Sequence, residues 1–270
     1  EKEYIADVLH SILHQKALND YEIIFSDGSS DDGTLELINV FLSDFPNLKL
    51  IHNPNKIVST GFNLALNEAK GDIIIRVDGH CELPPNYVEK CIELLHKQDA
   101  YIVGGRIATI SKGIVGKAIA KAQSSWFGVG GVKFRSTKYK RGGYVESLAF
   151  GVHRRELFAD IGGYDEQMIC NQDDEFNFRA IQAGKKIWMD PTIKIKYYSR
   201  SSFSNLFKQY FNYGCFKVRG IQKRRQIISI RHLIPATFVV GLMGTLIPGF
   251  ILQQPWFFSS VLTIYMIINI

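Results

Sequence analysis

A short apolar run that ends in polar residues sets the strongest limit on the fold of this chain. Residues 73–75 are all isoleucine, a β-branched residue typical of a buried strand, and Asp78 and His80 follow closely. Because ligands bind beyond the carboxyl ends of strands in open α/β sheets, both side chains are predicted to face a crevice. Carboxylate oxygen and imidazole nitrogen suit Mn²⁺ or a similar ion, whereas Mg²⁺ prefers oxygen ligands. The alternative is a plain turn that ends the strand.

Strand-like and helix-like segments alternate through the first part of the chain. Strands are expected at Glu22–Ser26 and Leu48–Ile51, and helices at Leu35–Phe45 and Gly61–Ala69. This spacing favours right-handed crossovers and therefore an α/β fold with a mostly parallel central sheet flanked by helices. The chain starts inside a helix-like segment, Glu3–Leu13, so we expect the first strand of such a fold to be missing.

The loop after the first of these strands is acidic and contains glycine. It reads Asp27-Gly28-Ser29-Ser30-Asp31-Asp32-Gly33-Thr34. A strand, a polar turn and a helix N-terminus form a natural nucleotide pocket, but the negative charge makes Asp27 a better acceptor for a base or ribose than a phosphate ligand. Asp32 is expected to cap the helix. A plain βα loop has the same composition and remains an alternative.

Residues 111–143 are glycine-rich and mix aromatic with basic side chains. These are Trp126, Phe127, Lys133, Phe134, Arg135, Lys138, Lys140 and Arg141. The segment could face an acceptor, meet lipid headgroups, or be an ordinary mobile insertion. A strand at Tyr144–Val152 and a helix at Arg154–Ile161 are predicted to follow.

A second acidic cluster opens a predicted helix that runs to Gly184. It consists of Asp173, Asp174 and Glu175. Acids in the first turn can simply complement the helix dipole. Alternatively, one of them acts as a general base, because a carboxylate near like charges binds a proton more tightly.

The end of the chain changes character. Residues 200–232 are basic and contain no Asp or Glu, whereas Leu233–Leu252 carries no charge and Pro255–Ile270 is a second apolar run. Because about 20 apolar residues span a bilayer, we predict transmembrane segments over 233–270, the second of them truncated, with the basic segment on the cytoplasmic side. A buried helical hairpin is the alternative. The net charge of +6 does not indicate nucleic-acid binding, because the basic residues concentrate beside the apolar runs.

Four motifs taken together resemble the family 2 inverting glycosyltransferases of the Rossmann-like GT-A fold, in the branch of the succinoglycan-biosynthesis enzymes. They are Ser26–Thr34, Arg76-Val77-Asp78-Gly79-His80, Gly162-Gly163-Tyr164-Asp165-Glu166 and Gln172–Arg179. The resemblance covers nearly the whole chain and implies a catalytic domain over residues 1–199.

The resemblance also implies roles for individual residues. Those implied to bind the nucleotide sugar are Asp27, Ser29, Lys56, Asn63, Arg76 and Asp78. Asp78 and His80 would hold a divalent cation, Mn²⁺ or Mg²⁺. Asp173 would deprotonate the acceptor, with Asp174 as the second choice.

Three departures from the family pattern bear on the function. His80 stands where the usual metal motif has a second Asp, and Gln172 replaces the customary Glu. Residues 209–213 lack the Arg and Trp of the Gln-x-x-Arg-Trp signature of processive synthases, which indicates transfer of single sugars.

We therefore expect a multi-pass enzyme of the cell membrane with a cytoplasmic catalytic domain. Its partners would be a nucleotide-diphosphate sugar and a lipid-linked or polysaccharide acceptor. One alternative is a nucleotidyltransferase, although that would need a basic glycine-rich loop for a triphosphate. The other is a membrane-tethered module that binds nucleotide sugars without catalysis.

Overall fold

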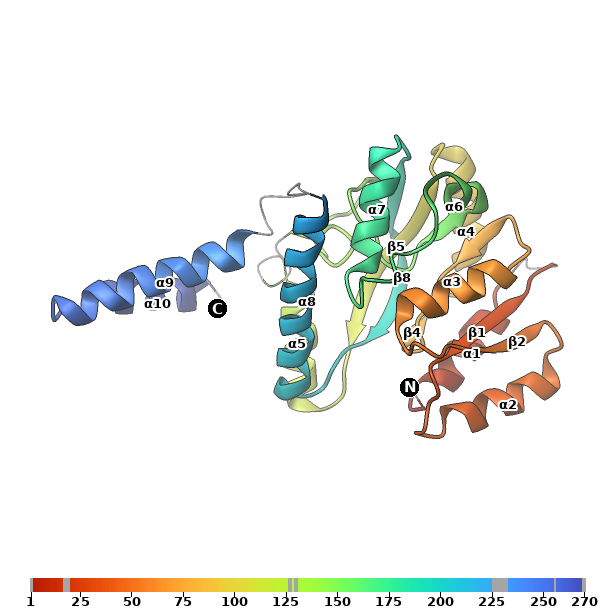
Figure 1. The fold of residues 1–270 in the computed structure, drawn as a ribbon, viewed down its shortest axis with the longest axis horizontal. Coiled ribbons are helices and arrows are strands. Elements are labelled where there is room, and N and C mark those ends of the chain that lie inside the picture. Colours follow the sequence, from red (N-terminus) through yellow and green to blue (C-terminus); the bar gives the residue numbers. More distant parts are fainter. Residues whose placement is uncertain are drawn as a thin grey trace. The chain divides into compact units, whose positions relative to one another are not determined.

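The computed structural model describes residues 2–16, 20–125, 128, 131–224, 233–254 and 256–268 (Figure 1). Two compact units make up the chain, Glu1–Phe216 and Lys217–Ile270. Trp126, Phe127 and the last part of the basic segment, residues 225–232, lie outside the described residues.

The first part of the chain confirms the expected alternation of helices and strands. Its elements are α1 (Ile5–Leu13), β1 (Ile23–Asp27), α2 (Thr34–Asp44), β2 (Leu48–His52), α3 (Val58–Glu68) and β3 (Ile73–Ile75). β1 and β2 pair in parallel, with Asp27 opposite His52 at their carboxyl ends. Ile5, Leu9 and Ile38 form a small buried core beside this pair.

A larger mixed sheet carries the rest of the first unit. Its further strands are β4 (Cys81–Glu82), β5 (Ile102–Ile110), β6 (Gly143–Tyr144), β7 (Val152–Arg154) and β8 (Ile187–Tyr198). The strand order is β3-β7-β5-β8-β4, and β6 pairs with β8. β5 and β8 are parallel, whereas the β3–β7, β5–β7, β4–β8 and β6–β8 pairs are antiparallel.

The prediction of a mostly parallel sheet is therefore wrong. Apolar β-branched runs indicate burial on both faces, which is typical of parallel strands, but they do not specify which way a neighbour runs. The strand predicted over Tyr144–Val152 is also broken. Residues 145–151 make an irregular turn between β6 and β7, with Phe150 at a positive φ of 56°.

Five further helices belong to the described part of the chain between β4 and α9. They are α4 (Tyr87–Lys97), α5 (Gly113–Ala122), α6 (Arg155–Ile161), α7 (Gln172–Gln182) and α8 (Phe203–Arg224). The core holds fully buried Tyr87, Ile102, Leu157, Phe176 and Met189. α8 extends through most of the described basic segment, and the boundary between the two units falls inside it.

The second unit contains α9 (Ile234–Ile251) and α10 (Trp256–Ile268). α9 has 18 residues with a mean hydropathy of 1.8, which is long and apolar enough to cross a membrane. α10 spans 13 residues and is shorter than such a span needs. Within the described residues, one helix thus meets the criteria of length and composition, and the expectation of several membrane spans is not confirmed.

Candidate functional site

The acidic loop after β1 is held by its own side chain. Asp27 is buried, and its carboxylate accepts hydrogen bonds from the Ser30 backbone N at 2.9 Å and the Ser30 Oγ at 2.6 Å. Ser29, between them, has a positive φ of 65°. Asp32 accepts from the backbone N of Thr34, the first residue of α2, at 3.1 Å, but the N-cap residue is Gly33, so Asp32 lies one residue before the position predicted for it. The Asp27 side chain thus fixes the loop, and a bound base or ribose would share its acceptor oxygens.

The loops after β1 and β2 lie against each other. Asp27 O accepts a hydrogen bond from Asn53 N at 2.7 Å, and a Cβ on Gly28 would lie 3.2 Å from Lys56 Cα. Lys56 has a positive φ of 57°. The structure therefore brings the loops that carry Asp27, Ser29 and Lys56 together, and puts a cation beside the acidic loop.

Helix α3 begins directly at this site. The Asn53 side chain donates from Nδ2 to Ile57 O at 2.9 Å and accepts from Thr60 Oγ1 at 2.9 Å. A Cβ on Gly61 would lie 2.8 Å from Asn53 Nδ2 and 2.9 Å from Ser26 Oγ. The first turn of α3 thus packs onto β1 and the loop after β2 through a glycine.

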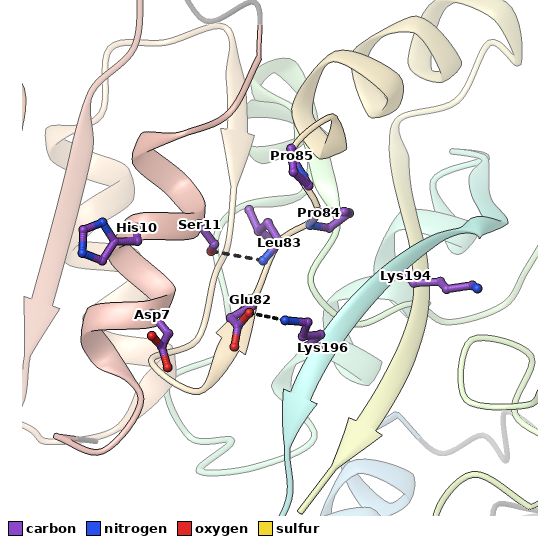
Figure 2. A pocket seen from close by; sticks show the side chains of 9 residues that line it. All are labelled: Asp7, His10, Ser11, Glu82, Leu83, Pro84, Pro85, Lys194 and Lys196. Carbon is purple, nitrogen blue, oxygen red and sulfur yellow. Dashed lines mark hydrogen bonds and ion pairs between the residues drawn. The ribbon is translucent and has the colours of Figure 1, made fainter.

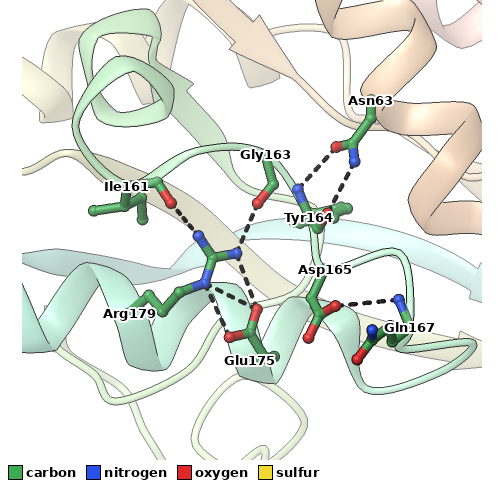
Figure 3. A network of polar contacts seen from close by, with 8 residues as sticks. All are labelled: Asn63, Ile161, Gly163, Tyr164, Asp165, Gln167, Glu175 and Arg179. Carbon is green, nitrogen blue, oxygen red and sulfur yellow. Dashed lines mark hydrogen bonds and ion pairs between the residues drawn. The ribbon is translucent and has the colours of Figure 1, made fainter.

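One turn later, Asn63 ties α3 to the Gly162–Glu166 motif (Figure 3). Its Oδ1 accepts from Tyr164 N at 2.8 Å, and its Nδ2 donates to Tyr164 O at 2.9 Å and to Glu166 Oε1 at 2.9 Å. Both ends of the amide are therefore used by the protein itself. The role of Asn63 in nucleotide binding stays a prediction, and its visible role is to position this motif.

Arg179 fixes the same motif from the opposite side (Figure 3). Its guanidinium donates to both Glu175 oxygens, at 2.9 and 3.0 Å from Nε, and to Gly163 O at 2.7 Å. It also donates to Ile161 O. Glu175, the third residue of the acidic cluster, is buried in this ion pair and therefore serves structure.

Arg76 and Asp78 form a partly buried ion pair beside Tyr164. Nε of Arg76 lies 2.9 Å from Asp78 Oδ1, Nη2 lies 3.0 Å from Oδ2, and Nη1 lies 3.5 Å from the Tyr164 hydroxyl. Burial alone would lower the pKa of the Arg76 guanidinium, but the charges of Asp78 and Asp173 and the Tyr164 hydroxyl hold it above the ordinary value. These four side chains form one electrostatic cluster, which we call the Arg76 cluster.

Asp173 and Asp174 have different surroundings at the start of α7. Asp174 Oδ1 accepts from Ser147 Oγ at 2.7 Å, which fixes this carboxylate against the turn before β7. Asp173 Oδ1 accepts from Asp174 N at 2.9 Å. Burial is the main cause of the raised pKa of the Tyr164 hydroxyl, and the Asp173 charge adds to it. Asp173 thus acts on both Arg76 and Tyr164 of the Arg76 cluster through its charge.

His80 lies in the turn that follows Asp78. Its backbone O accepts from Tyr198 N at 3.0 Å, and its ring packs edge-on to Tyr197, with centroids 4.9 Å apart. Among the described residues, no group of three or more His, Cys, Asp or Glu side chains could hold a metal ion. The role of Asp78 and His80 as metal ligands therefore stays a prediction.

On the other side of His80 lie Tyr197, which the sequence did not point to, and Arg135, which lies in the segment that was predicted to face an acceptor or lipid. The Arg135 guanidinium lies 5.4 Å from the centre of the Tyr197 ring, so the segment 111–143 reaches the site. Tyr213 of α8 accepts from Asn171 Nδ2 through its backbone O at 3.0 Å and from Gln209 through its hydroxyl at 3.0 Å. Burial, rather than the nearby charges, is the main cause of the raised pKa of Tyr213. Aromatic residues alone carry no local signal that distinguishes a site from a core.

A pocket of about 490 Å³ lies beside α1 and β4 (Figure 2). Its polar lining includes Asp7, His10 and the Glu82–Lys196 ion pair, at 2.7 Å. None of the residues predicted to bind donor or metal lines it. This pocket is therefore not the candidate site.

Comparison with known proteins identifies the family of this chain. The profile of Glycosyl transferase family 2 matches residues 1–162. The succinoglycan biosynthesis protein ExoA of Rhizobium meliloti is 33% identical over 232 residues, which are 83% of this chain and 68% of that protein. The dolichyl N-acetyl-alpha-D-glucosaminyl phosphate 3-beta-D-2,3-diacetamido-2,3-dideoxy-beta-D-glucuronosyltransferase of Methanococcus voltae is 29% identical over 261 residues, 93% of this chain and 80% of that protein.

Solved structures share the fold at low sequence identity. The structure of GalNAc-T7 with UDP, GalNAc and Mn2+ aligns with a TM-score of 0.58 at 15% identity, over 74% of this chain and 42% of that one. S. aureus TarS 1-349 in complex with UDP-GlcNAc aligns with a TM-score of 0.57 at 14% identity, over 80% of this chain and 62% of that one. This chain thus spans less than two thirds of the length of either structure.

Proposed function

Because the chain belongs to glycosyl transferase family 2 and has the GT-A fold, we propose that it moves a single sugar, with inversion, from a nucleotide-diphosphate sugar to a lipid-linked or polysaccharide acceptor. The observation that carries the proposal is the Arg76 cluster. In it the Arg76 guanidinium pairs with Asp78 of the nucleotide and metal motif, and the charge of Asp173 of the acidic motif raises the pKa of the same guanidinium. Donor and acceptor chemistry would therefore meet at one place.

The donor nucleotide would lie over the loops after β1 and β2. Asp27 offers carboxylate oxygens to a base or ribose, and Lys56 offers a cation from the neighbouring loop. Solved relatives of the same fold contain UDP or UDP-GlcNAc, which supports a uridine-type donor for this chain. α3 links these loops to the Tyr164 backbone and would hold the two halves of the site in register.

The diphosphate would lie at Asp78 and His80, which would hold a divalent cation. When bound, such an ion supplies positive charge that neutralises the leaving diphosphate. Arg76 orients the Asp78 carboxylate with two parallel hydrogen bonds, the geometry that a planar guanidinium fits best. Arg135 and His80 add further basic groups on the side of Tyr197.

Asp173 would act as the general base. It takes the proton of an acceptor hydroxyl while that oxygen forms a bond to the anomeric carbon and the bond from this carbon to the diphosphate oxygen breaks. The electron pair of the broken bond leaves with the diphosphate. Attack from the face opposite the leaving group inverts the anomeric carbon.

Features of the C-terminal part of the chain support a reaction that takes place at a membrane. α9 meets the length and hydropathy of a membrane span, and the chain before it is basic, as expected of a cytoplasmic flank. The names of the relatives, a succinoglycan biosynthesis protein and a transferase acting on a dolichyl-linked sugar, support a polysaccharide or lipid-linked acceptor.

The test is transfer or donor hydrolysis by the full chain in detergent, screened over nucleotide sugars with Mn²⁺, Mg²⁺ or a chelator. Asp173→Asn should lose turnover by about 10²–10⁴-fold while binding donor normally, since general-base catalysis is worth that much. Asp174→Asn is the matched control, because its amide oxygen can still accept from Ser147.

His80→Ala should raise the metal concentration needed for turnover. Donor binding without turnover for any acceptor, unaffected by Asp173→Asn, would instead make the protein a binding module. A nucleotidyl product formed from a nucleoside triphosphate would make it a nucleotidyltransferase.

A further inference from the structure

Helix α8 exposes a row of aromatic side chains. Phe203, Phe207 and Phe211 recur every four residues, so they lie on one face of the helix, and they are 67%, 72% and 62% exposed. The rings of Phe207 and Phe211 stack with centroids 6.2 Å apart. The other face of α8 carries Tyr213 and the buried Phe216, toward the body of the first unit. Three exposed phenylalanines in a row are unusual for a helix that faces only water.

Helix α5 lies next to α8 and also exposes an apolar side chain. α5 and α8 lie side by side (Figure 1), and a groove of about 300 Å³ between them is lined mainly by apolar side chains, among them Ile119 and Leu206. Ile114, at the start of α5, is 90% exposed. We call the exposed residues Phe203, Phe207 and Phe211 of α8, together with Ile114 of α5, the α5–α8 face.

The two helices of the α5–α8 face also carry basic residues. Lys117 and Lys121 of α5 and Lys208 of α8 are exposed. The sequence has no Asp or Glu between Ser111 and Val145, and none after Asp190, so both helices come from stretches without acids. Apolar side chains accompanied by cations match an anionic lipid surface in both hydrophobicity and charge.

We propose that the α5–α8 face lies in the headgroup region of an anionic phospholipid membrane, with its aromatic rings inserted toward the acyl chains. A second copy of the chain is a poorer occupant, because it would bring like charges together. The next helix along the chain after α8 is α9, which is long and apolar enough to cross a membrane. The α5–α8 face therefore precedes a candidate membrane span in the sequence. This contact is additional to that span and does not depend on catalysis.

The membrane contact also bears on the candidate active site. This step rests on the proposed transferase function. The backbone of Tyr213, on the inner face of α8, is hydrogen-bonded to Asn171, the residue before α7. α7 carries Asp173 in its first turn. A membrane contact on the outer face of α8 would therefore set the distance of the base from the lipid surface, which suits an acceptor that is itself embedded in lipid.

The experiment places a tryptophan on the face in the full chain, reconstituted into vesicles of phosphatidylcholine and phosphatidylglycerol. Phe207→Trp is compared with Val40→Trp, at a similarly exposed position of α2, distant from α5 and α8 in the first unit (Figure 1). The emission of the wild-type tryptophans is subtracted from each. Brominated lipids should quench about half of the added emission at position 207, since such helices insert about 5–10 Å into the interface, and little at position 40.

Each other outcome overturns the proposal. Quenching of position 207 by aqueous iodide but not by brominated lipid means that the face points to water. Quenching by neither means that protein covers it, as in a complex of two copies. A variant with Lys117→Gln, Lys121→Gln and Lys208→Gln should lose the dependence of lipid quenching on phosphatidylglycerol. An unchanged dependence would contradict the proposed attraction of these lysines to anionic lipid.

The measurement needs neither donor nor acceptor. An Asp173→Asn protein should therefore show the same quenching as the wild type, and failure of the membrane contact leaves the transferase proposal standing.

Discussion

Arg76 donates hydrogen bonds to both carboxylate oxygens of Asp78, two residues later in the chain. They run from Nε at 2.9 Å and from Nη2 at 3.0 Å. The Arg76 side chain is 9% exposed and that of Asp78 is 22% exposed, so one side of the carboxylate remains open to a ligand. The Arg76 guanidinium also lies 5.5 Å from the centre of the Tyr164 ring, which restricts its rotation. The ion pair therefore fixes the orientation of the Asp78 carboxylate and also balances its charge.

Replacing Arg76 by lysine should separate these two effects. Arg76→Lys keeps the positive charge but loses the planar fork, so Asp78 would no longer be held in one orientation. Because changes to groups that orient a metal ligand typically cost 10–100-fold, we expect kcat/KM to fall by about 10–100-fold and the Mn²⁺ requirement to rise. A Mn²⁺ titration of turnover at donor concentrations below KM measures both.

The matched control is Arg155→Lys, a half-buried arginine outside the Arg76 cluster that donates to Gly71 O at 3.1 Å, and it should behave as the wild type. If Arg76→Lys also kept full turnover and metal affinity, the ion pair would serve only to neutralise charge.

The local part of the fold could be predicted because its signals are local. Glycine and proline turns and helical periodicity lie within about ten residues, and the strands and helices from Glu22 to Ala69 were found within a few residues of their ends. The direction of pairing could not be predicted in this way. β3 pairs with β7, whose Arg154 lies opposite Ile73, and nothing in either short apolar run encodes that distant partner.

The candidate site shows the same limit. Three consecutive acids at the start of α7 are equivalent in the sequence, yet Glu175 is bound by Arg179 and Asp174 by Ser147. Successive residues of a helix point about 100° apart, so they meet different neighbours, and those neighbours come from other elements. The motifs therefore identified the acidic cluster, and the structure separated its members.

Asn63 is expected to contribute to the stability of the fold, and to donor binding only through that stability. Asn63→Ala removes the partners of both Tyr164 backbone groups, which lie 101 residues away in the chain. Leaving such groups unsatisfied costs about 1–3 kcal/mol, so we expect a lower melting temperature and a loosened Arg76 cluster. Asn67→Ala, an exposed position on the same helix, is the control and should change neither.

Thermal unfolding and donor titration are measured together on both variants. Weaker donor binding by Asn63→Ala at an unchanged melting temperature would contradict this assignment and place the side chain on the nucleotide.

Gly61 should tolerate no side chain, although it lies inside a helix. A Cβ there would lie 2.8 Å from Asn53 Nδ2 and 2.9 Å from Ser26 Oγ, closer than such atoms approach each other. Gly61→Ala should therefore destabilise the protein by about 1–3 kcal/mol through overpacking. Gly214→Ala in α8, where a Cβ meets nothing within 4 Å, should instead stabilise by up to about 1 kcal/mol through helix propensity. Chemical denaturation of the two variants gives the signs, and a stabilised Gly61→Ala would show that Asn53 can move aside.

His153 should make the fold sensitive to acid. It is buried in β7, and burial, with a smaller contribution from the Arg76 charge, lowers its pKa from 6.5 to about 4. Between those values the unfolded chain binds a proton that the folded chain does not, so stability is complete above pH 6.5 and falls as the pH decreases toward 4. The shift corresponds to roughly 3 kcal/mol.

Melting temperatures in detergent between pH 7.5 and 4.5 test this directly on three proteins, the wild type and two variants. His153→Asn can still donate to Ile74 O, the partner of Nδ1 at 3.3 Å, but cannot titrate, so it should lose most of the decline that the wild type shows below pH 6.5. His96→Asn, at an exposed position of α4, should decline as the wild type does. Equal declines in all three proteins would mean that carboxylates, rather than the buried imidazole, set the acid limit of the fold.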